Sequence, residues 1–462
     1  MNSKPILIGN AQGFWGDSVD APARLVSQQP DLDYLTLDYL AEVSMSILAL
    51  QKERDATGGY ARDFVEVIRS LVPFWRDGSK VRVITNAGGL NPQGCASACA
   101  EVLRQAGIRP MKIGVVTGDD VLPVLQTDAG TKAFTNLETG EPIKKISESL
   151  VTANAYLGAQ PVADALAAGA DIVITGRVAD PSLTVAPCMA EFGWSPNDHD
   201  RIAGATIAGH LIECGTQVTG GISTDWLQIP DAANIGFPVV EVSRDGACVV
   251  TKPERTGGVV NERTVKEQLL YEIGDPDNYL SPDVTVSFLS LQVRGEKKNR
   301  VRVGGAKGRP ASSSYKVSAS YRDGFWAQGT LTIFGRDAVA KARRCGEIIL
   351  QRVRAAGYKL QRSNVECLGA GACLPGGLDK FIEQPRKLSG LETVLRVTVA
   401  DPRREAVERF AKEMSPLITS GPQGVTGYAA GRPRVHPVFG YWPCLIDKKL
   451  VKPQVTIMTT DQ

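Results

Sequence analysis

The sequence predicts an α/β fold: a mainly parallel, Rossmann-like sheet with helices on both faces, followed by a smaller α+β domain. Three observations lead to this prediction. Short apolar runs alternate with helix-like segments in the first part of the chain, which is typical of βαβ units. Several of these runs are continuous, as in strands that are buried on both faces. From about residue 282 onward, the pattern acquires more β character.

In chain order, the first part contains strands that are each followed by a polar loop and, in most cases, a helical pattern. The strands are predicted at 5–8, 34–38, 81–85, 111–116 and 171–174, and the helices at 41–52, 61–75, 92–105 and 163–168.

The second part is predicted to pair its strands antiparallel beside two helices. The strands lie at 284–294, 301–304, 314–321, 327–334 and 391–400, and the helices at 337–356 and 403–414. Turn residues cluster in "GDPDNYLSP" at 274–282, which predicts a linker there. We therefore expect an α/β domain over 1–280 and an α+β domain over 281–462.

Composition excludes several classes of protein. The chain has 462 residues and a formal net charge of +2, and it lacks a block of like charges, so we expect no nucleic-acid partner. No uncharged apolar run approaches the roughly 18 residues that span a bilayer, and the start lacks a signal-peptide core. The nine cysteines are scattered without a Cys-x-x-Cys pair, which favours reduced thiols. We expect a cytoplasmic protein with no membrane partner.

Polar, glycine-rich loops follow the predicted parallel strands, and ligands bind at such strand ends. The loops lie at 9–14, 86–94, 118–120, 154–160 and 176–180. Glycine allows close backbone approach, and Asn and Gln both donate and accept hydrogen bonds. The alternative is that such loops need these residues only to turn. The predicted substrate-binding residues, from these loops and from two later segments, are Asn10, Asn86, Gly88, Gly89, Asn91, Asn154, Arg177, Gln217 and Lys307.

The stretch "VRVITNAGGLNPQGCASACAEVLRQAG" at 81–107 has the strand, glycine turn and helix of many phosphate sites. It matches neither G-x-x-x-x-G-K-[ST] nor G-x-G-x-x-G, so the nucleotide motifs are excluded. A glycine turn at a helix start can still hold a carboxylate or phosphate oxygen.

Four charged residues lie shortly after predicted strands. Asp119 and Asp120 could bind a divalent metal such as Mg²⁺ or act as a base, or they could only cap a helix. Arg177 follows a buried strand, where it could bind an anion with both arms of its guanidinium or pair with a protein carboxylate. Asp180 could be an acid, a base or a helix cap.

The stretch "AGHLIECGTQVTGG" at 208–221 is unusual because it holds one of only three histidines. On a helix, His210, Glu213 and Cys214 lie within one turn of each other. His210 and Glu213 could transfer a proton, and Cys214 could act as a nucleophile. His210 could also join Asp119 and Asp120 at a metal, which would favour Zn²⁺ or Mn²⁺. The remaining alternative is a structural histidine near a helix end.

Together, seven ordered segments resemble the acyclic terpene utilisation AtuA-like family. They are "GNAQGFWGD", "ITNAGGLNPQGCA", "VTGDD", "TANAYLGAQPV", "ITGRVADPSL", "GHLIECGTQVTGG" and "YEIGDPDNYLSPDV". The resemblance implies a role in bacterial catabolism of citronellol and geraniol, in the context of acyl-CoA carboxylation and hydration. It carries over no catalytic residues. Some members have an additional domain of about 100 residues, which we expect here as a separate small subunit.

The function expected from these residues is that of a catabolic enzyme acting on a small carboxylate or an acyl-CoA thioester. We expect lyase chemistry, either hydration and dehydration or proton abstraction next to a carbonyl, in a homo-oligomer. One alternative is a non-catalytic subunit of an acyl-CoA carboxylase or hydratase complex. Another is an ester or thioester hydrolase that uses Cys214.

Overall fold

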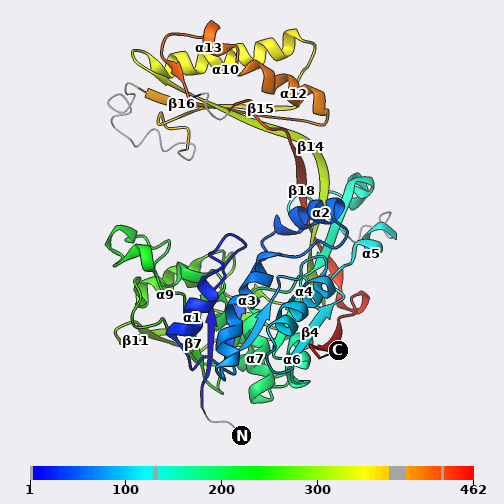
Figure 1. Cartoon of the computed structure of the whole chain (residues 1–462), viewed down its shortest axis with the longest axis vertical. Coiled ribbons are helices and arrows are strands. Elements are labelled where there is room, and N and C mark those ends of the chain that lie inside the picture. The colour runs from blue at the N-terminus through cyan, green and yellow to red at the C-terminus, as the bar shows by residue number, and fades with distance from the viewer. Residues whose placement is uncertain (1–3, 128–133, 374–391, 428–430, 462) are drawn as a thin grey trace. The chain divides into compact units, whose positions relative to one another are not determined.

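The computed structural model of the chain describes residues 4–127, 134–373, 392–427 and 431–461, and it divides into two compact units (Figure 1). Unit 1 comprises Met1–Ser320 and Tyr441–Gln462, and unit 2 comprises Tyr321–Gly440. This division differs from the predicted one at 280/281. The predicted linker at 274–282 lies inside unit 1, and the end of the chain belongs to unit 1 as well.

Unit 1 is built on five neighbouring parallel strands whose side chains are almost all buried. Their order in the sheet is β1-β2-β3-β6-β4, and each neighbouring pair is parallel. Continuous apolar runs form these strands because helices cover both faces. The strands are β1 (Ile6–Asn10), β2 (Tyr34–Leu37), β3 (Arg82–Thr85), β4 (Lys112–Thr117) and β6 (Ile172–Thr175).

Antiparallel strands extend this core at both edges, so the sheet is mixed and the Rossmann-like parallel arrangement is not confirmed. The added strands beside β1 form two hairpins with short turns, and a turn of that length cannot make the long crossover that parallel strands require. The final strand pairs antiparallel with β4 at the other edge. The added strands are β7 (Val239–Val242), β8 (Cys248–Thr251), β11 (Gln292–Lys297), β12 (Arg300–Gly304) and β19 (Gln454–Thr459).

Helices pack in two layers on the faces of the sheet. The first layer shares a core cluster with alternate residues of the strands, such as Leu35, Val83 and Ile174. The second layer packs as a continuous row, in which α7 touches both of its neighbours. The first layer is α1 (Ala21–Gln28), α3 (Asp63–Arg76) and α4 (Pro92–Gln105), and the second is α6 (Gln160–Ala167), α7 (Ser182–Phe192) and α8 (His199–Ile212).

The chain leaves neighbouring strands β3 and β6 toward opposite faces of the sheet. From β3 it continues into α4, in the first layer, and from β6 into α7, in the second. Ligands in open α/β sheets bind in the crevice at the carboxyl ends of two such strands. This crevice lies between the loops that begin at Asn86 and Gly176.

The remaining elements of unit 1 surround this framework. Strand β5 pairs with β14 (Ser314–Phe334), and β13-β10-β9 form a small antiparallel sheet beside α8. These elements are α2 (Ser44–Arg54), α5 (Leu122–Thr127), β5 (Leu150–Ala155), α9 (Glu262–Leu270), β9 (Tyr279–Leu280), β10 (Thr285–Ser287) and β13 (Lys307–Arg309), with short 3-10 turns between them.

Unit 2 has its own sheet and its own apolar core. The residues predicted as two strands at 314–321 and 327–334 form one long strand, β14, which starts in unit 1. Helices α10 and α12 cover the sheet through a separate core cluster that includes Ile349, Leu395 and Phe410. The elements are β14 (Ser314–Phe334), α10 (Ala338–Ala355), β15 (Arg362–Leu368), β16 (Glu392–Asp401), α12 (Arg404–Glu413), α13 (Leu417–Ser420), β17 (Val425–Thr426) and β18 (His436–Asp447).

We predict that unit 1 folds without unit 2. A chain in which a short Gly-Ser linker replaces residues 321–440 should stay soluble and melt cooperatively, because the core cluster shared by the first helix layer and the sheet contains no described residue of that range. The linker can be short, since a Cβ atom at Gly440 would lie 2.2 Å from the ring of Tyr321. Circular dichroism and a thermal scan measure this outcome. An unfolded spectrum would contradict it.

Candidate functional site

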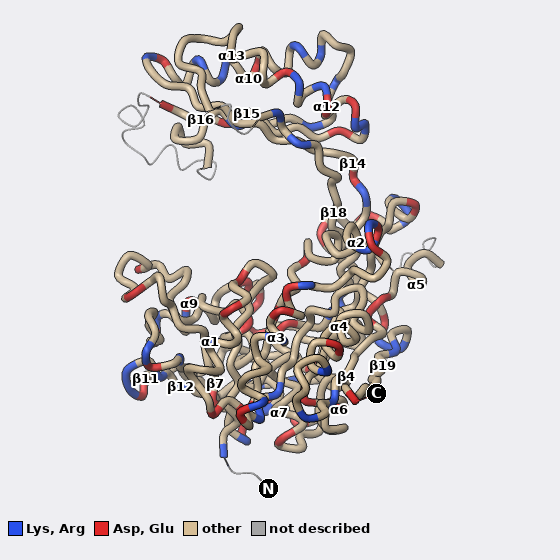
Figure 2. The backbone as a smooth tube through the Cα atoms, in the orientation of Figure 1, with Lys and Arg blue, Asp and Glu red and all other residues tan. Residues whose placement is uncertain are grey.

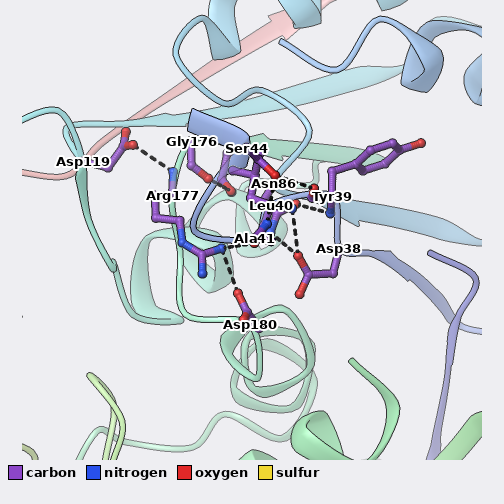
Figure 3. A network of polar contacts seen from close by, with 11 residues as sticks. Asp38, Tyr39, Leu40, Ala41, Ser44, Asn86, Asp119, Gly176, Arg177 and Asp180 are labelled. Atoms are coloured by element: carbon purple, nitrogen blue, oxygen red, sulfur yellow. Dashed lines mark hydrogen bonds and ion pairs between the residues drawn. The ribbon is translucent and has the colours of Figure 1, made fainter. Parts of the chain in front are cut away.

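Buried polar side chains meet at the carboxyl ends of β2, β3 and β6 (Figure 3). The Asn86 side chain donates to Asp38 Oδ1 at 2.6 Å and accepts from the backbone N–H of Tyr39 at 2.7 Å. Asn86 is fully buried, so both ends of its amide are occupied by protein. It therefore orients Asp38, and the contact with substrate that we predicted for Asn86 is not supported.

Arg177 is the largest fully buried side chain among the described residues, and it links four loops. Its backbone N–H donates to Asp119 Oδ2 at 2.8 Å, and its Nη1 donates to the carbonyl of Leu40 at 2.6 Å. Nη1 also lies 2.9 Å from Asp180 Oδ1. The guanidinium carbon stacks 4.1 Å above the centre of the Tyr156 ring. Arg177 thus holds the loops after β2, β4, β5 and β6 together.

Three buried polar atoms in this region, Arg177 Nε, Tyr156 Oη and Tyr441 Oη, make no well-aligned hydrogen bond within the described ranges, although the Tyr156 hydroxyl lies close enough to interact with both Arg177 and Tyr441. The ring of Tyr156 stacks on the Arg177 guanidinium. Burial raises the pKa of Tyr441, and the nearby Tyr156 raises it further. The contacts of the guanidinium with the Leu40 carbonyl and with Asp180 both use Nη1. Neither contact uses the edge formed by Nε and Nη2, which is the edge that binds a carboxylate through two parallel hydrogen bonds. Unsatisfied buried donors are costly, so this arrangement is suited to an incoming oxygen.

Carboxyl groups around Arg177 hold their protons to unusually high pH. Burial raises the pKa of Asp180 to about 6, with a further rise from Glu213 and Glu42 against the opposing effect of Arg177. Because 33% of the Asp180 side chain is accessible, solvent screens part of this rise. Burial and the charge of Asp180 place the pKa of Asp38 well above its ordinary value. The carboxyls outnumber the single cation that they share.

Asp119 borders a cavity of about 450 Å³ that opens beside the crevice. Its Oδ2 accepts from Arg177 and from Asn154 Nδ2, both at 2.8 Å. Burial raises the pKa of Asp119 to about 6, although these two bonds oppose the rise. A Cβ atom at Gly176 would lie 2.4 Å from Asp119 Oδ1, so glycine is required there. Asn154 also lines the cavity, and its Oδ1 is buried without a partner within the described part of the chain.

The donor set does not fit the predicted metal site. Asp120 is exposed, and its Oδ1 accepts from the backbone N–H of Leu122 at the start of α5, as a helix cap does. Asp119 Oδ2 already receives two N–H groups, which a cation would have to displace. Across the described residues, no group of three or more His, Cys, Asp or Glu side chains is placed to hold a metal ion. The expected Mg²⁺, Zn²⁺ or Mn²⁺ therefore has no supporting geometry.

His210 does not reach the crevice with a ring nitrogen. Its Nδ1 lies 3.0 Å from Glu213 Oε1, and its Nε2 lies 2.9 Å from the carbonyl of Gln268. The rings of Tyr279 and Phe288 enclose it, each with its centre 6.1 Å away. The prediction that His210 meets a substrate directly is therefore not supported. Both of its partners are acceptors, which favours the doubly protonated ring.

The other two residues of that stretch differ in what they offer. Glu213 Oε2 is buried without a partner among the described residues, and Glu213 is close enough to raise the pKa of Asp180. Burial, together with the charge of Glu213, raises the pKa of the Cys214 thiol, so the thiolate that a nucleophile requires is disfavoured. This leaves Glu213 as a candidate and opposes the role of Cys214.

Three predicted contact residues have structural roles elsewhere. Asn10 donates to the carbonyls of Ile212 and Glu213 at 2.5 and 2.9 Å, which caps the end of α8. Asn91 is the N-cap of α4, and its Nδ2 donates to the carbonyls of Thr57 and Gly58 in the loop between α2 and α3. Lys307 pairs with Asp200 at 2.8 Å in the first turn of α8. That turn lies about 20 Å along the helix from Glu213, at about 1.5 Å a residue.

The remaining candidates are two glycines and one glutamine. A Cβ atom at Gly88 would lie 2.5 Å from the carbonyl oxygen of Thr175, so Gly88 lets β6 approach the start of α4. Gly89 has a φ of 51° and lines the 450 Å³ cavity. Gln217 ends a 3-10 turn after α8, and its Oε1 is buried without a partner in the described ranges. No contact joins Gln217 to Arg177.

Sequence reasoning missed Asp38, Tyr156 and Tyr441. Asp38 ended a predicted strand, and Tyr156 lay in a loop already singled out, so their positions at strand ends could have indicated them. Tyr441 carried no such signal, because it lies 264 residues beyond Arg177 in a segment assigned to another domain.

These features define an α/β protein with a buried arginine–carboxylate centre at the carboxyl ends of its parallel strands. Residues 6–457 match the acyclic terpene utilisation family protein AtuA, and the chain belongs to this family. No curated protein and no solved structure matches the chain. Within the described part of the chain, no helix combines the length and apolarity needed to cross a membrane.

We predict that Gly88→Ala destabilises the protein by about 1–3 kcal/mol, as other overpacked sites do. The added methyl group would meet backbone atoms, with Pro92 Cα at 2.8 Å in addition to the Thr175 carbonyl, and backbone cannot move aside cheaply. Thermal unfolding measures the loss. Gly274→Ala is the matched control, because its Cβ would meet no heavy atom within 4 Å. Equal melting temperatures for the two variants would disprove this account of Gly88.

We predict that the His210–Glu213 pair stabilises the protein in acid more than in base. Burial alone lowers the pKa of His210, but the hydrogen bond and charge of Glu213 outweigh it and raise that pKa above 6.5. The contribution is therefore fully present below pH 6.5 and is lost as pH rises through the folded-state pKa.

Unfolding free energies of the wild type and of His210→Gln, measured across this pH range, test the prediction. Their difference should shrink as pH rises. His436→Gln changes an exposed histidine of unit 2 and should leave the profile unchanged. A difference that is constant with pH would rule out the charged pair.

Proposed function

We propose that this protein is a catabolic enzyme acting on a small carboxylate or an acyl-CoA thioester. The proposed reaction is of the lyase type, with proton abstraction next to a carbonyl and loss or addition of water. One observation carries the proposal: among the described residues, buried polar atoms of Arg177, Tyr156 and Tyr441 lack a well-aligned hydrogen-bond partner beside a carboxyl group, Asp180, whose pKa is about 6.

The three donors are suited to bind a carbonyl or carboxylate oxygen of the substrate. When a proton leaves the neighbouring carbon, negative charge moves onto that oxygen as an enolate forms. Donors fixed in a dry environment stabilise such charge because they need not reorganise. Burial alone lowers the pKa of Arg177, but Asp180, Tyr156 and Asp38 raise it, so the cation is retained.

Asp180 is the proposed base. Its side chain is partly accessible and ion-paired to Arg177, so a substrate oxygen at Arg177 would present the adjacent carbon to it. In dehydration, the carboxylate takes the proton from that carbon, and the proton then leaves with the β-hydroxyl group as water. The substrate loses one hydrogen and one hydroxyl group, and Asp180 is regenerated. A pKa near 6 suits both transfers near neutral pH.

The family and the cysteines support the biological part of the proposal. Acyclic terpene utilisation, the role that the family description names, is a catabolic process. All nine cysteines are free thiols, which supports a reducing compartment such as the cytoplasm.

We predict that kcat/KM falls as pH drops through about 6, because protonation removes the base. Purified protein is assayed with 3-hydroxyacyl-CoA thioesters and with free 3-hydroxy acids. Asp180→Asn should lower turnover by roughly 10²–10⁴-fold. Arg177→Lys should lower it by roughly 10²–10³-fold, since lysine lacks the bidentate edge.

Matched variants assign the effect to this centre. Tyr156→Phe should lower turnover while preserving the stacked ring, and Lys307→Gln should leave it unchanged. Asp119→Asn tests whether the 450 Å³ cavity takes part as well. Full turnover by Asp180→Asn would refute the proposed base. A wild type without turnover that copurifies with an acyl-CoA carboxylase would favour the non-catalytic subunit.

A further inference from the structure

A second, larger groove lies in unit 1 over strands β7, β8 and β12. Its volume is about 1370 Å³, and its walls include the end of α1, the hairpin turn between β11 and β12, and the loop at 252–261. No residue of this groove belongs to the Arg177 centre. Figure 2 shows Lys and Arg concentrated along β11 and β12, beside the groove.

Lys252 is a buried cation in this groove without a carboxylate partner. Only 4% of the surface of Lys252 is exposed to solvent. Its Nζ donates to the carbonyl and the Oγ1 of Thr256, at 2.8 and 3.1 Å, and no ion pair to it occurs among the described residues. An ammonium group has three N–H donors, so one remains available. A buried charge without a counter-ion is unfavourable unless something anionic completes the site.

Other cations gather around Lys252. Lys298 is close enough to add to the effect of burial in lowering the pKa of Lys252. Arg255, Lys297 and Lys298 are exposed at the rim, and none of them has an ion pair within the described ranges. Four cations of the groove therefore lack a protein counter-charge.

The acidic residues of the groove are largely neutralised. Both oxygens of Glu241 accept from Arg300, at 2.5 and 2.6 Å. Glu262 accepts from Lys266 and from the backbone N–H of Gly295. Asp231 and Glu254 are the two acids of the groove without an ion pair in the described part of the chain. Two unpaired acids against four unpaired cations leave the groove electropositive.

The backbone adds little to anion binding here. The N–H groups of Gly257 and Gly258 donate to the carbonyls of Asn234 and Pro230, both at 2.8 Å. These glycines allow close packing: a Cβ atom at Gly257 would lie 2.0 Å from the carbonyl oxygen of Asp231. Side-chain cations therefore carry the binding, which favours a group with two or more negative charges.

We propose that this groove binds a phosphorylated small molecule, with a phosphate group on Lys252 Nζ and Lys298 at its side. The volume accommodates a ligand of nucleotide size, larger than a lone phosphate ion. The phosphate could belong to a nucleotide or to a sugar phosphate, which present the same group to the lysines. This inference rests on the groove alone and is independent of the proposed function.

Calorimetric titration of the full-length chain with inorganic pyrophosphate, in a buffer free of phosphate and sulfate, tests the proposal. The wild type should bind saturably and more weakly as salt increases. Lys252→Gln should weaken binding by about 10–100-fold, the range for one charge-assisted hydrogen bond. Lys298 is exposed at the rim, so the Lys298→Gln variant should fold normally. It should weaken binding several-fold. ADP and a sugar phosphate are titrated in parallel, and the one that binds more tightly identifies the class of molecule that carries the phosphate group.

Arg294→Gln is the matched control, because Arg294 is exposed on β11 but does not line the groove. Its affinity for pyrophosphate should equal that of the wild type. The proposal is overturned if the wild type shows no saturable binding. It is also overturned if Lys298→Gln and Lys252→Gln bind as the wild type does, or if Arg294→Gln loses as much affinity as they do.

Discussion

The placement of one guanidinium group, that of Arg177, determines how the strand-end loops of unit 1 are arranged. Burying a charged arginine is costly unless its donors find acceptors and its charge finds a partner. The guanidinium finds its partners in Leu40, Asp180 and the ring of Tyr156, which come from the ends of three different strands. The backbone N–H of Arg177 donates to Asp119, which follows a fourth strand. The loops are therefore positioned by a shared ion, in addition to their own turns.

The carboxyl groups beside this ion have raised pKa values. Asp38 and Asp180 share a single cation, and their burial and the repulsion between acids outweigh its attraction. Such an imbalance reduces stability, because charged carboxylates are poorly compensated there. It also provides one group, Asp180, that can take up and release a proton near pH 6, and perturbed carboxyls of this kind cluster at functional sites.

The two polar regions of unit 1 have opposite electrostatic character. Around Arg177, acids exceed the available cation, which suits proton transfer beside a bound oxygen. Around Lys252, cations exceed the acids, because Arg300 neutralises Glu241 at the floor of the groove. Each site is thus defined by the charges that remain after the protein's own pairs are counted, and not by the number of charged residues that line it.

The sequence by itself determined the five parallel strands of unit 1, the loops at their ends and the positions of Asp119 and Arg177 within those loops, because apolar periodicity and glycine turns are local properties. It also indicated a second α+β unit, with helices close to the observed α10 and α12. Only the tertiary structure decided which strands meet: hairpins and the last strand made the sheet mixed, and Tyr441 came to lie beside Tyr156. It also directed His210 toward Gln268 and placed Lys307 at the far end of α8. Strand partners and side-chain directions depend on residues far apart in the chain, and local patterns carry no information about them.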